Sequence, residues 1–179
     1  MTENNRKEFM EELFNKHSSM VYRTAYFLTK SRAMADDITQ ETFIRMIKKI
    51  HLYDSEKPIE PWIYRITINI TRNMLRKQKL LNLIRIPSDI PEGKVIETTI
   101  LQNERKDDLW KEINRLSHKS KEVIILHFYS ELTLVEVANS LDVPIGTCKS
   151  RLNYALTKLR KSMSDKEILK VKQKLKEGI

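Results

Sequence analysis

The sequence predicts an all-α protein of two small helical domains joined by a linker, the C-terminal domain containing a helix-turn-helix. Three observations support this prediction. Apolar residues recur at helical spacing along most of the chain. The chain has only 3 glycines, and it lacks the strand alternation and hairpin dipeptides that are typical of β-structure. Prolines and acidic residues interrupt the helical pattern near the middle of the chain.

The N-terminal domain is predicted to span residues 1–86. An apolar face from Phe9 to Leu28 indicates its first helix. A second helix is predicted over 36–50, because acids lie in its first turns and bases in its last, which complements the helix dipole. We expect its apolar face to contain Ile38, Phe43, Met46, Ile47 and Ile50.

A polar segment over 51–60 is predicted to be a loop. Pro61 can begin a third helix, because the first helical turn does not need its missing N–H. The apolar residues of that helix are Trp62, Ile66, Ile70 and Met74, and we expect them to form core.

Beyond the break, residues 87–102 are predicted to be a linker, 103–163 a second domain and 164–179 a basic tail. Leu109, Ile113 and Leu116 form one helical stripe, and residues 121–129 form a second apolar helix.

The most informative segment follows. Thr133 and Glu136 form a capping box that predicts a helix start, and Asp142-Val-Pro144 ends that helix, with Pro144 placed to open the next. One face of the next helix is apolar, with Cys148, Leu152, Ala155, Leu156, Leu159 and Met163 at helical spacing. The opposite face carries Lys149, Ser150, Asn153, Thr157 and Arg160, and no acid occurs over 145–163. This pattern predicts a helix-turn-helix that reads the DNA major groove. The alternative is an ordinary helical hairpin with a solvated basic face.

The charge distribution also favours nucleic acid as a partner. The formal net charge is +9, which implies a polyanionic partner or an anionic surface. Residues 61–86 contain six bases and no acid, whereas 87–104 contain four acids and one base. Two basic segments on either side of an acidic spacer indicate two separate DNA contacts.

The cellular location is predicted from absences in the sequence. Cys148 is the only cysteine, so no internal disulfide can form, and its place on the apolar stripe predicts a small core residue. No apolar run reaches the length of a membrane span, and the polar N-terminus does not resemble a signal peptide. We expect a cytoplasmic protein.

An enzyme is not expected, and neither is a cofactor, a metal ion or a small-molecule substrate. The sequence has no glycine-rich phosphate loop and no Cys/His cluster with metal-ligand spacing. Its histidines, His17, His51, His118 and His127, are scattered along the chain. We expect His127 to be a core histidine with a hydrogen-bond partner.

Three segments together resemble one family, the bacterial RNA polymerase sigma factors of the extracytoplasmic-function type. Ala35-Asp-Asp-Ile-Thr-Gln-Glu-Thr-Phe-Ile-Arg45 is similar to the helix that binds core polymerase. Pro61-Trp-Ile-Tyr-Arg-Ile-Thr-Ile-Asn69 resembles the helix over the −10 promoter element. Val143-Pro-Ile-Gly-Thr-Cys-Lys-Ser-Arg-Leu152 is similar to the recognition helix for the −35 element. The resemblance covers about residues 7–163.

The resemblance implies two helical domains that bind core polymerase and place one domain on each promoter element. The expected polymerase-binding residues are Asp37, Gln40, Glu41 and Arg45, which can share one helix face. The expected −10 contacts are the loop residues Tyr53, Asp54, Ser55, Glu56 and Lys57, which would capture a flipped base, and the helix residues Asn69, Arg72, Asn73, Arg76 and Lys77. Amide and guanidinium groups can form paired hydrogen bonds with base edges.

The expected −35 contacts are Thr147, Lys149, Ser150, Arg151, Asn153 and Tyr154, of which Thr147 and Arg151 are assigned to phosphates. The chain departs from the family pattern at Tyr154, where arginine is common, at Cys148, where valine is usual, and at Asn73, where aspartate is frequent. Tyr154 can offer a hydroxyl group or an apolar contact to a thymine methyl group.

The resemblance further implies an anti-sigma protein as a partner and a linker that threads the polymerase's RNA exit path. The main alternative is a conventional helix-turn-helix regulator that binds duplex DNA on its own; such a protein needs no second basic DNA helix. Another alternative is an antagonist that mimics part of this family, which the basic charge and the intact recognition helix disfavour.

Overall fold

The computed structural model describes residues 3–84 and 104–162, and every regular element in these ranges is helical. The N-terminal range contains α1 (Glu3–Thr29), α2 (Arg32–Lys49), the short 3₁₀ helix η1 (Ile50–Leu52) and α3 (Ile59–Ile84). The C-terminal range contains α4 (Glu104–Arg115), α5 (His118–Ile124), the π-helical segment η2 (Ile125–Tyr129), α6 (Leu134–Leu141) and α7 (Ile145–Ser162). The all-α prediction is confirmed. The predicted linker, 87–102, and tail, 164–179, lie outside the described residues.

Two helices begin earlier than the sequence predicted. The Ser31 hydroxyl caps α2 by accepting a hydrogen bond of 3.2 Å from the Met34 N–H, so the helix starts at Arg32 and not at residue 36. Helix α3 starts at Ile59, which places Pro61 inside the first turn. A proline is tolerated there, because the residues of the first turn do not donate backbone hydrogen bonds within the helix, so the missing N–H costs no bond.

Helices α1–α3 bury a core between them, and threonines line much of it. Ile38, Met46 and Ile63 are almost fully buried. The buried hydroxyls of Thr39, Thr42, Thr67 and Thr71 each donate to the carbonyl oxygen four residues earlier, at 2.7–2.9 Å. Each hydroxyl is therefore satisfied within its own helix and requires no partner from a neighbouring one.

The expected apolar face of α2 was wrong at one position. Ile47 is 45% exposed, together with Ile44 at 44%. The buried stripe instead follows Ala35, Ile38, Thr42 and Met46, which recur at spacings of three and four residues. Ile47 lies one step of about 100° beyond Met46, outside the stripe.

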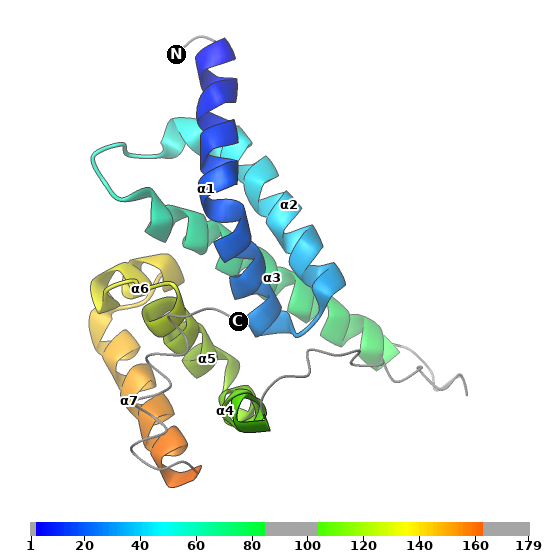
Figure 1. The fold of residues 1–179 in the computed structure, drawn as a ribbon, viewed down its shortest axis with the longest axis vertical. Coiled ribbons are helices and arrows are strands. Elements are labelled where there is room, and N and C mark those ends of the chain that lie inside the picture. The colour runs from blue at the N-terminus through cyan, green and yellow to red at the C-terminus, as the bar shows by residue number, and fades with distance from the viewer. Residues whose placement is uncertain (1–2, 85–103, 163–179) are drawn as a thin grey trace.

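The N-terminal and C-terminal helices also share a core. One continuous cluster of buried residues takes Phe27, Leu28, Tyr64 and Ile68 from α1 and α3, and it includes Val137 and Leu141 of α6. Figure 1 shows α1–α3 as one bundle with the C-terminal helices beside it, where α6 contacts α3, and α5 and η2 contact α1. The sequence predicted two helical units, but it contained no signal for packing between them.

Aromatic rings extend this shared core. The rings of Phe27 and Trp110 stack with centroids 4.3 Å apart, and Tyr129 meets Phe27 edge-on at 4.8 Å. The Lys30 ammonium group lies 4.5 Å from the centroid of the Trp110 ring. These contacts join the C-terminal end of α1 to α4 and η2, so that the two halves of the chain meet along more than one helix pair.

Residues 121–129 were predicted to form an apolar helix, and the structure shows two kinds of helix in this segment. Helix α5 ends at Ile124 and continues as the wider η2, whose end is marked by the Ser130 N–H donating to the Ile125 carbonyl at 3.0 Å. His127 is half-buried, and its Nδ1 lies 2.8 Å from the Leu132 carbonyl oxygen. The expected partnered histidine is present.

The capping box of α6 predicts a measurable effect on stability. The Thr133 hydroxyl accepts from the Glu136 N–H at 3.3 Å, and the Glu136 carboxylate accepts from the Thr133 N–H at 2.7 Å. We expect Thr133→Ala to lower the free energy of unfolding by about 1 kcal/mol, because a helix N–H loses its acceptor. Urea denaturation followed by circular dichroism measures the change. Thr133→Ser keeps the hydroxyl and is the control; equal losses in both variants would contradict the capping role.

Candidate nucleic-acid interface

The turn between α6 and α7 is fixed by its backbone hydrogen bonds. The Val143 N–H donates to the Ala138 carbonyl at 3.0 Å, and the Asp142 N–H donates to the Asn139 carbonyl at 3.3 Å. This pair of bonds closes a helix through a residue with left-handed backbone angles. Asp142 holds that position, with φ of 57°, and aspartate tolerates it better than most residues. The predicted helix-turn-helix is therefore present.

Helix α7 begins at Ile145, one residue later than the sequence predicted, and the Pro144 carbonyl accepts from the Cys148 N–H at 3.1 Å. Its inner face matches the predicted apolar stripe, since the side chains of Cys148, Leu152, Ala155 and Leu159 are all buried. Burial raises the pKa of the Cys148 thiol, opposed by the nearby Arg151 charge. This environment fits the expected small core residue and not a reactive thiol.

The outer face of α7 is polar and open to solvent. The side chains of Lys149, Ser150, Asn153 and Tyr154 are exposed, whereas Thr147 and Arg151 are half-buried. The Lys158 ammonium group lies 5.7 Å from the centroid of the Tyr154 ring. One nitrogen of Arg151, Nη1, is buried and has no hydrogen-bond partner within the described ranges 3–84 and 104–162. The predicted −35 residues therefore share one side of this helix.

The second candidate surface lies on α3. The side chains of Asn69, Asn73, Arg76 and Lys77 are exposed, while Tyr64, Ile68 and Ile70 on the other sides of the helix are buried. Residues 69, 73, 76 and 77 are neighbours at spacings of three and four on a helix surface. These four of the side chains predicted for the −10 element thus form one continuous strip.

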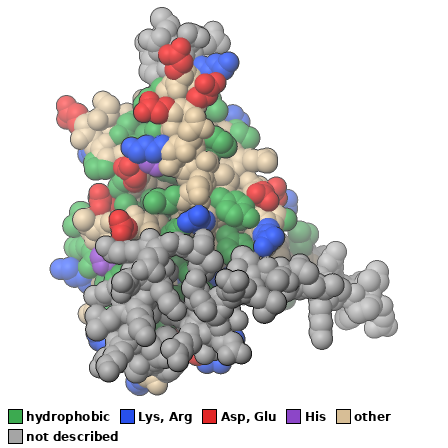
Figure 2. Space-filling view, viewed as in Figure 1, with side chains coloured by type: hydrophobic (Ala, Val, Ile, Leu, Met, Phe, Trp, Pro, Cys, Tyr) green, Lys and Arg blue, Asp and Glu red, His purple; other side chains and the backbone are tan. Residues whose placement is uncertain are grey.

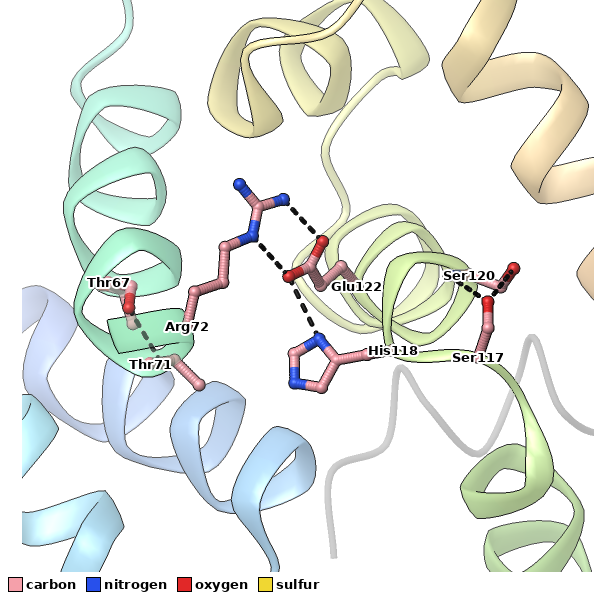
Figure 3. A network of polar contacts seen from close by, with 7 residues as sticks. All are labelled: Thr67, Thr71, Arg72, Ser117, His118, Ser120 and Glu122. Atoms are coloured by element: carbon pink, nitrogen blue, oxygen red, sulfur yellow. Dashed lines mark hydrogen bonds and ion pairs between the residues drawn. The ribbon is translucent and has the colours of Figure 1, made fainter. Parts of the chain in front are cut away.

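Arg72 differs from its neighbours on α3. Its guanidinium group is turned toward α5, where Nε and Nη2 each donate to one oxygen of the Glu122 carboxylate at 2.7 Å. The Glu122 side chain is 1% exposed, and His118 Nδ1 lies 3.2 Å from its Oε1. Figure 3 shows the two side chains reaching across the gap between α3 and α5. Arg72 is therefore paired within the chain at the position where a DNA contact was predicted.

The electrostatics of this contact favour the charged forms. Burial would raise the pKa of Glu122, but hydrogen bonds from Arg72 and His118 outweigh it, and the pKa is lowered overall. The hydrogen bond to Glu122 likewise raises the pKa of Arg72. The pair is thus a charge-assisted, two-bond contact, the strongest geometry available to arginine and a carboxylate.

The predicted base-capturing loop is an ordered turn. Tyr53 is half-buried, its ring lies 5.4 Å from that of Trp62, and its hydroxyl donates to the Lys57 carbonyl. Asp54 Oδ2 is 2.7 Å from Lys57 Nζ, and Asp54 Oδ1 accepts from the Glu56 N–H at 3.2 Å. The hydrogen bond to Lys57 lowers the pKa of Asp54. Ser55, Glu56 and Lys57 are exposed, so the loop presents polar groups beside the start of α3.

The predicted polymerase-binding residues lie on the outer face of α2. Asp37 and Gln40 are exposed, and Glu41 is half-buried and pairs with Arg45 at 2.6 Å. The exposed side chain of Ile44 continues the same helix face by its spacing from residues 37, 40 and 41. Sequence reasoning missed this apolar component, because isoleucine in an amphipathic helix is normally assigned to the core.

Polar contacts between the halves of the chain were also missed. Besides the Arg72–Glu122 pair, Arg65 Nη2 lies 3.1 Å from Asp142 Oδ1, and the Ser140 hydroxyl donates to the Pro61 carbonyl at 3.1 Å. Their partners are 50 to 79 residues apart in the sequence, and no local pattern could have revealed them.

The described surface carries side chains of both charges. Figure 2 shows acidic and basic side chains interspersed on one face of the N-terminal helices, with hydrophobic side chains between them. In the part of the chain that the structure describes, no helix is long and apolar enough to cross a membrane. The same residues contain no group of three histidine, cysteine or acidic side chains that could hold a metal ion.

Comparison with known proteins matches two parts of the chain to family models. The family model for Sigma-70 region 2 matches residues 13–80, and the model for Sigma-70 region 4 matches residues 113–161. The first match covers the candidate surfaces of α2 and α3, and the second covers the helix-turn-helix.

Individual relatives extend over most of the chain. The chain is 27% identical to the extracytoplasmic-function sigma factor SigW of Bacillus subtilis, over 86% of this chain and 88% of that protein. It is 30% identical to SigE of Mycolicibacterium smegmatis, over 84% of this chain and 60% of that protein. A solved structure with a similar fold is that of the sigma factor RpoE of Bartonella quintana in complex with the anti-sigma factor NepR. The TM-score is 0.67 at 23% identity, covering 87% of this chain and 96% of that chain.

Proposed function

The chain belongs to the extracytoplasmic-function sigma factors of bacterial RNA polymerase, and from that premise we propose how its residues divide the work of initiation. As a sigma factor it binds core polymerase and directs promoter-specific transcription initiation. The residue assignments follow from the two solvent-facing strips on α3 and α7. Each strip combines amide and basic groups, and the two strips fall in separate family regions.

In this proposal α7 reads the −35 element as duplex DNA. Lys149, Ser150, Asn153 and Tyr154 are exposed on its outer face and meet the major groove, and the Lys149 ammonium group pairs with a phosphate at the edge of that groove. The half-buried Thr147 and Arg151 contact phosphates, which fix the register of the helix on the duplex.

The −10 element is assigned to α3 and the turn before it. Asn69, Arg72, Asn73, Arg76 and Lys77 supply contacts to phosphates and base edges. The turn formed by Tyr53, Asp54, Ser55, Glu56 and Lys57 captures a flipped base, with the Tyr53 ring as its aromatic surface.

Core polymerase is assigned to the outer face of α2. Asp37, Gln40, Glu41 and Arg45 provide its polar contacts, and the exposed Ile44 and Ile47 provide apolar area between them. A mixed surface of this kind is typical of protein–protein interfaces, where an apolar centre has a polar rim.

The remaining partners and the setting are part of the proposal. We propose domain limits at 1–86 and 103–163, joined by the linker 87–102 and followed by the tail 164–179. An anti-sigma protein is the expected regulatory partner, as in the complex of RpoE with NepR. We place the protein in the cytoplasm, where core polymerase and promoter DNA are found, and assign it no catalytic activity of its own.

Run-off transcription tests the proposal directly. Purified core polymerase is combined with a library of promoter-sized DNA fragments, with and without this protein. We expect new start sites that appear only with the protein and share sequences at −10 and −35. A conventional regulator, which the family matches disfavour, would instead bind duplex DNA tightly and form no complex with core polymerase.

The recognition helix gives a second prediction. We expect Lys149→Ala to weaken binding to a duplex carrying the −35 sequence, because one ammonium–phosphate contact is lost. The slope of log affinity against log salt concentration should become shallower by about one unit. Fluorescence anisotropy across a salt series measures both. Lys48→Ala removes an equally exposed charge from α2 and should leave the slope unchanged; an unchanged slope in Lys149→Ala would argue against a phosphate contact.

The α2 face gives a third prediction. The double variant Gln40→Ala, Glu41→Ala should lose most binding to core polymerase in a pull-down assay, because Gln40 is exposed and Glu41 supports Arg45. Its circular dichroism spectrum should match that of the wild type. Glu12→Ala, an exposed change on α1, is the matched control. Full polymerase binding by the folded double variant would remove this face from the interface.

A further inference from the structure

We propose that the contact between Arg72, Glu122 and His118 is an autoinhibitory clasp, which holds the chain closed and withholds Arg72 from the −10 strand until α3 and α5 separate. This inference rests on the proposed function, since it assigns a regulatory state to the same DNA-binding surface. Figure 3 shows the three side chains that form the clasp.

The first argument is the competition for one guanidinium group. Both oxygens of Glu122 receive a hydrogen bond of 2.7 Å from Arg72. A carboxylate held in this way resembles a DNA phosphate, because arginine binds both anions through the same pair of parallel hydrogen bonds. Arg72 therefore cannot bind a phosphate and Glu122 through these donors at the same time. Glu122 therefore competes with DNA for this guanidinium group.

The second argument is that Glu122 is dedicated to this contact. Its side chain is 1% exposed, whereas exposed acids are available elsewhere on the chain. A buried carboxylate is tolerated only with partners that compensate its lost hydration. Those partners are Arg72 on α3 and His118 on its own helix, and Lys121 beside it pairs instead with Asn114 at 3.1 Å. When α3 moves away, Glu122 becomes accessible to water, which replaces the lost partner.

The third argument is a matter of distance. Helix α6 contacts both α3 and α7, and the axes of packed helices lie about 8–10 Å apart, so α3 and α7 are separated by about 20 Å. The −10 and −35 elements are centred about 25 base pairs apart, or about 85 Å along B-form DNA at 3.4 Å per step. The closed chain cannot place both helices on their elements. The shared core must open, and the clasp opposes that opening.

The effect of the clasp falls on one of the two DNA surfaces. In the closed arrangement Lys149, Ser150, Asn153 and Tyr154 remain exposed on α7, whereas Arg72 on α3 is occupied. Additional contacts between Arg65 and Asp142 and between Ser140 and Pro61 hold α6 against the start of α3. The clasp therefore inhibits the −10 surface selectively and leaves the −35 surface able to meet duplex DNA.

The first test measures closure in the full chain. Spin labels are attached at Lys48→Cys on α2 and Thr157→Cys on α7, both exposed positions, in a Cys148→Ala background. In the labelled protein that keeps Glu122, pulsed electron paramagnetic resonance should show one short distance between the two spin labels. Glu122→Gln keeps the shape of the side chain and removes its charge, and it should add a longer, broad distance population. A broad, long distribution already in the protein with the wild-type clasp would overturn the proposal without any need for the variant to fold.

The second test measures DNA binding, with a labelled mixed-sequence 20-mer as the probe, single-stranded or as a duplex. We expect Glu122→Gln to bind the single strand about tenfold more tightly, because apparent affinity rises with the fraction of open molecules. Duplex affinity should change by less than about twofold. Glu12→Gln removes the same charge from an exposed site on α1 and controls for net charge. The clasp would be contradicted if Glu122→Gln increased the affinity for single strand and duplex equally. It would also be contradicted if Glu12→Gln increased the affinity for the single strand as much as Glu122→Gln does.

A double-mutant cycle ties the gain to Arg72. The gain caused by Glu122→Gln should disappear in the Arg72→Gln background, since no guanidinium group remains to be released; a gain that persists would overturn the assignment. Run-off transcription by the wild type separates this result from the proposed function. If the wild type is active in transcription and Glu122→Gln does not change DNA binding, the clasp alone is refuted. If the wild type does not bind core polymerase, the proposed function is refuted, and the spin-label distance still decides whether the chain is closed.

Discussion

The structure depends on α3 being packed on two sides at once. Ile63 and Ile70 contribute to the cores that α3 shares with α1 and α2, whereas Tyr64 and Ile68 enter the core shared with α5–α7. Only a narrow strip of the helix remains for polar side chains. Arg72 lies at the edge of that strip, and its long side chain can reach either solvent or α5. The competition for its guanidinium group follows from this double packing.

The buried charge of Glu122 explains why the two halves meet in a defined way. Apolar surfaces alone would tolerate sliding, since hydrophobic contacts have little directional preference. A fork of two hydrogen bonds at 2.7 Å tolerates very little displacement, and any shift leaves a carboxylate buried without its partner. Tyr64 adds a related constraint, because burial raises the pKa of its phenol and keeps the group neutral in the shared core.

Local features of this fold were predictable from the sequence, and long-range ones were not. The period of apolar residues located the helices, and Thr133 with Glu136 located the start of α6, because these signals lie within one or two helical turns. The same reasoning placed Cys148 in the core and Lys149 on the surface. It placed Ile47 in the core, whereas that side chain is exposed and the buried face of α2 includes Thr39 and Thr42 instead. It could not distinguish Arg72 from Arg76, because the difference lies in a carboxylate 50 residues away.

The two DNA surfaces of the chain consequently differ in kind. The α7 surface is complete once the C-terminal helices fold, since its inner face packs against α5 and α6 and its outer face is open. The α3 surface is complete only when the rest of the chain moves away, because one of its bases is bound to α5. Arginine makes this arrangement possible, since its planar fork binds a carboxylate and a phosphate equally well, whereas lysine binds both as a point charge with little geometric selectivity. The guanidinium group of Arg72 can therefore bind Glu122 in the closed chain and a phosphate in the chain engaged with DNA.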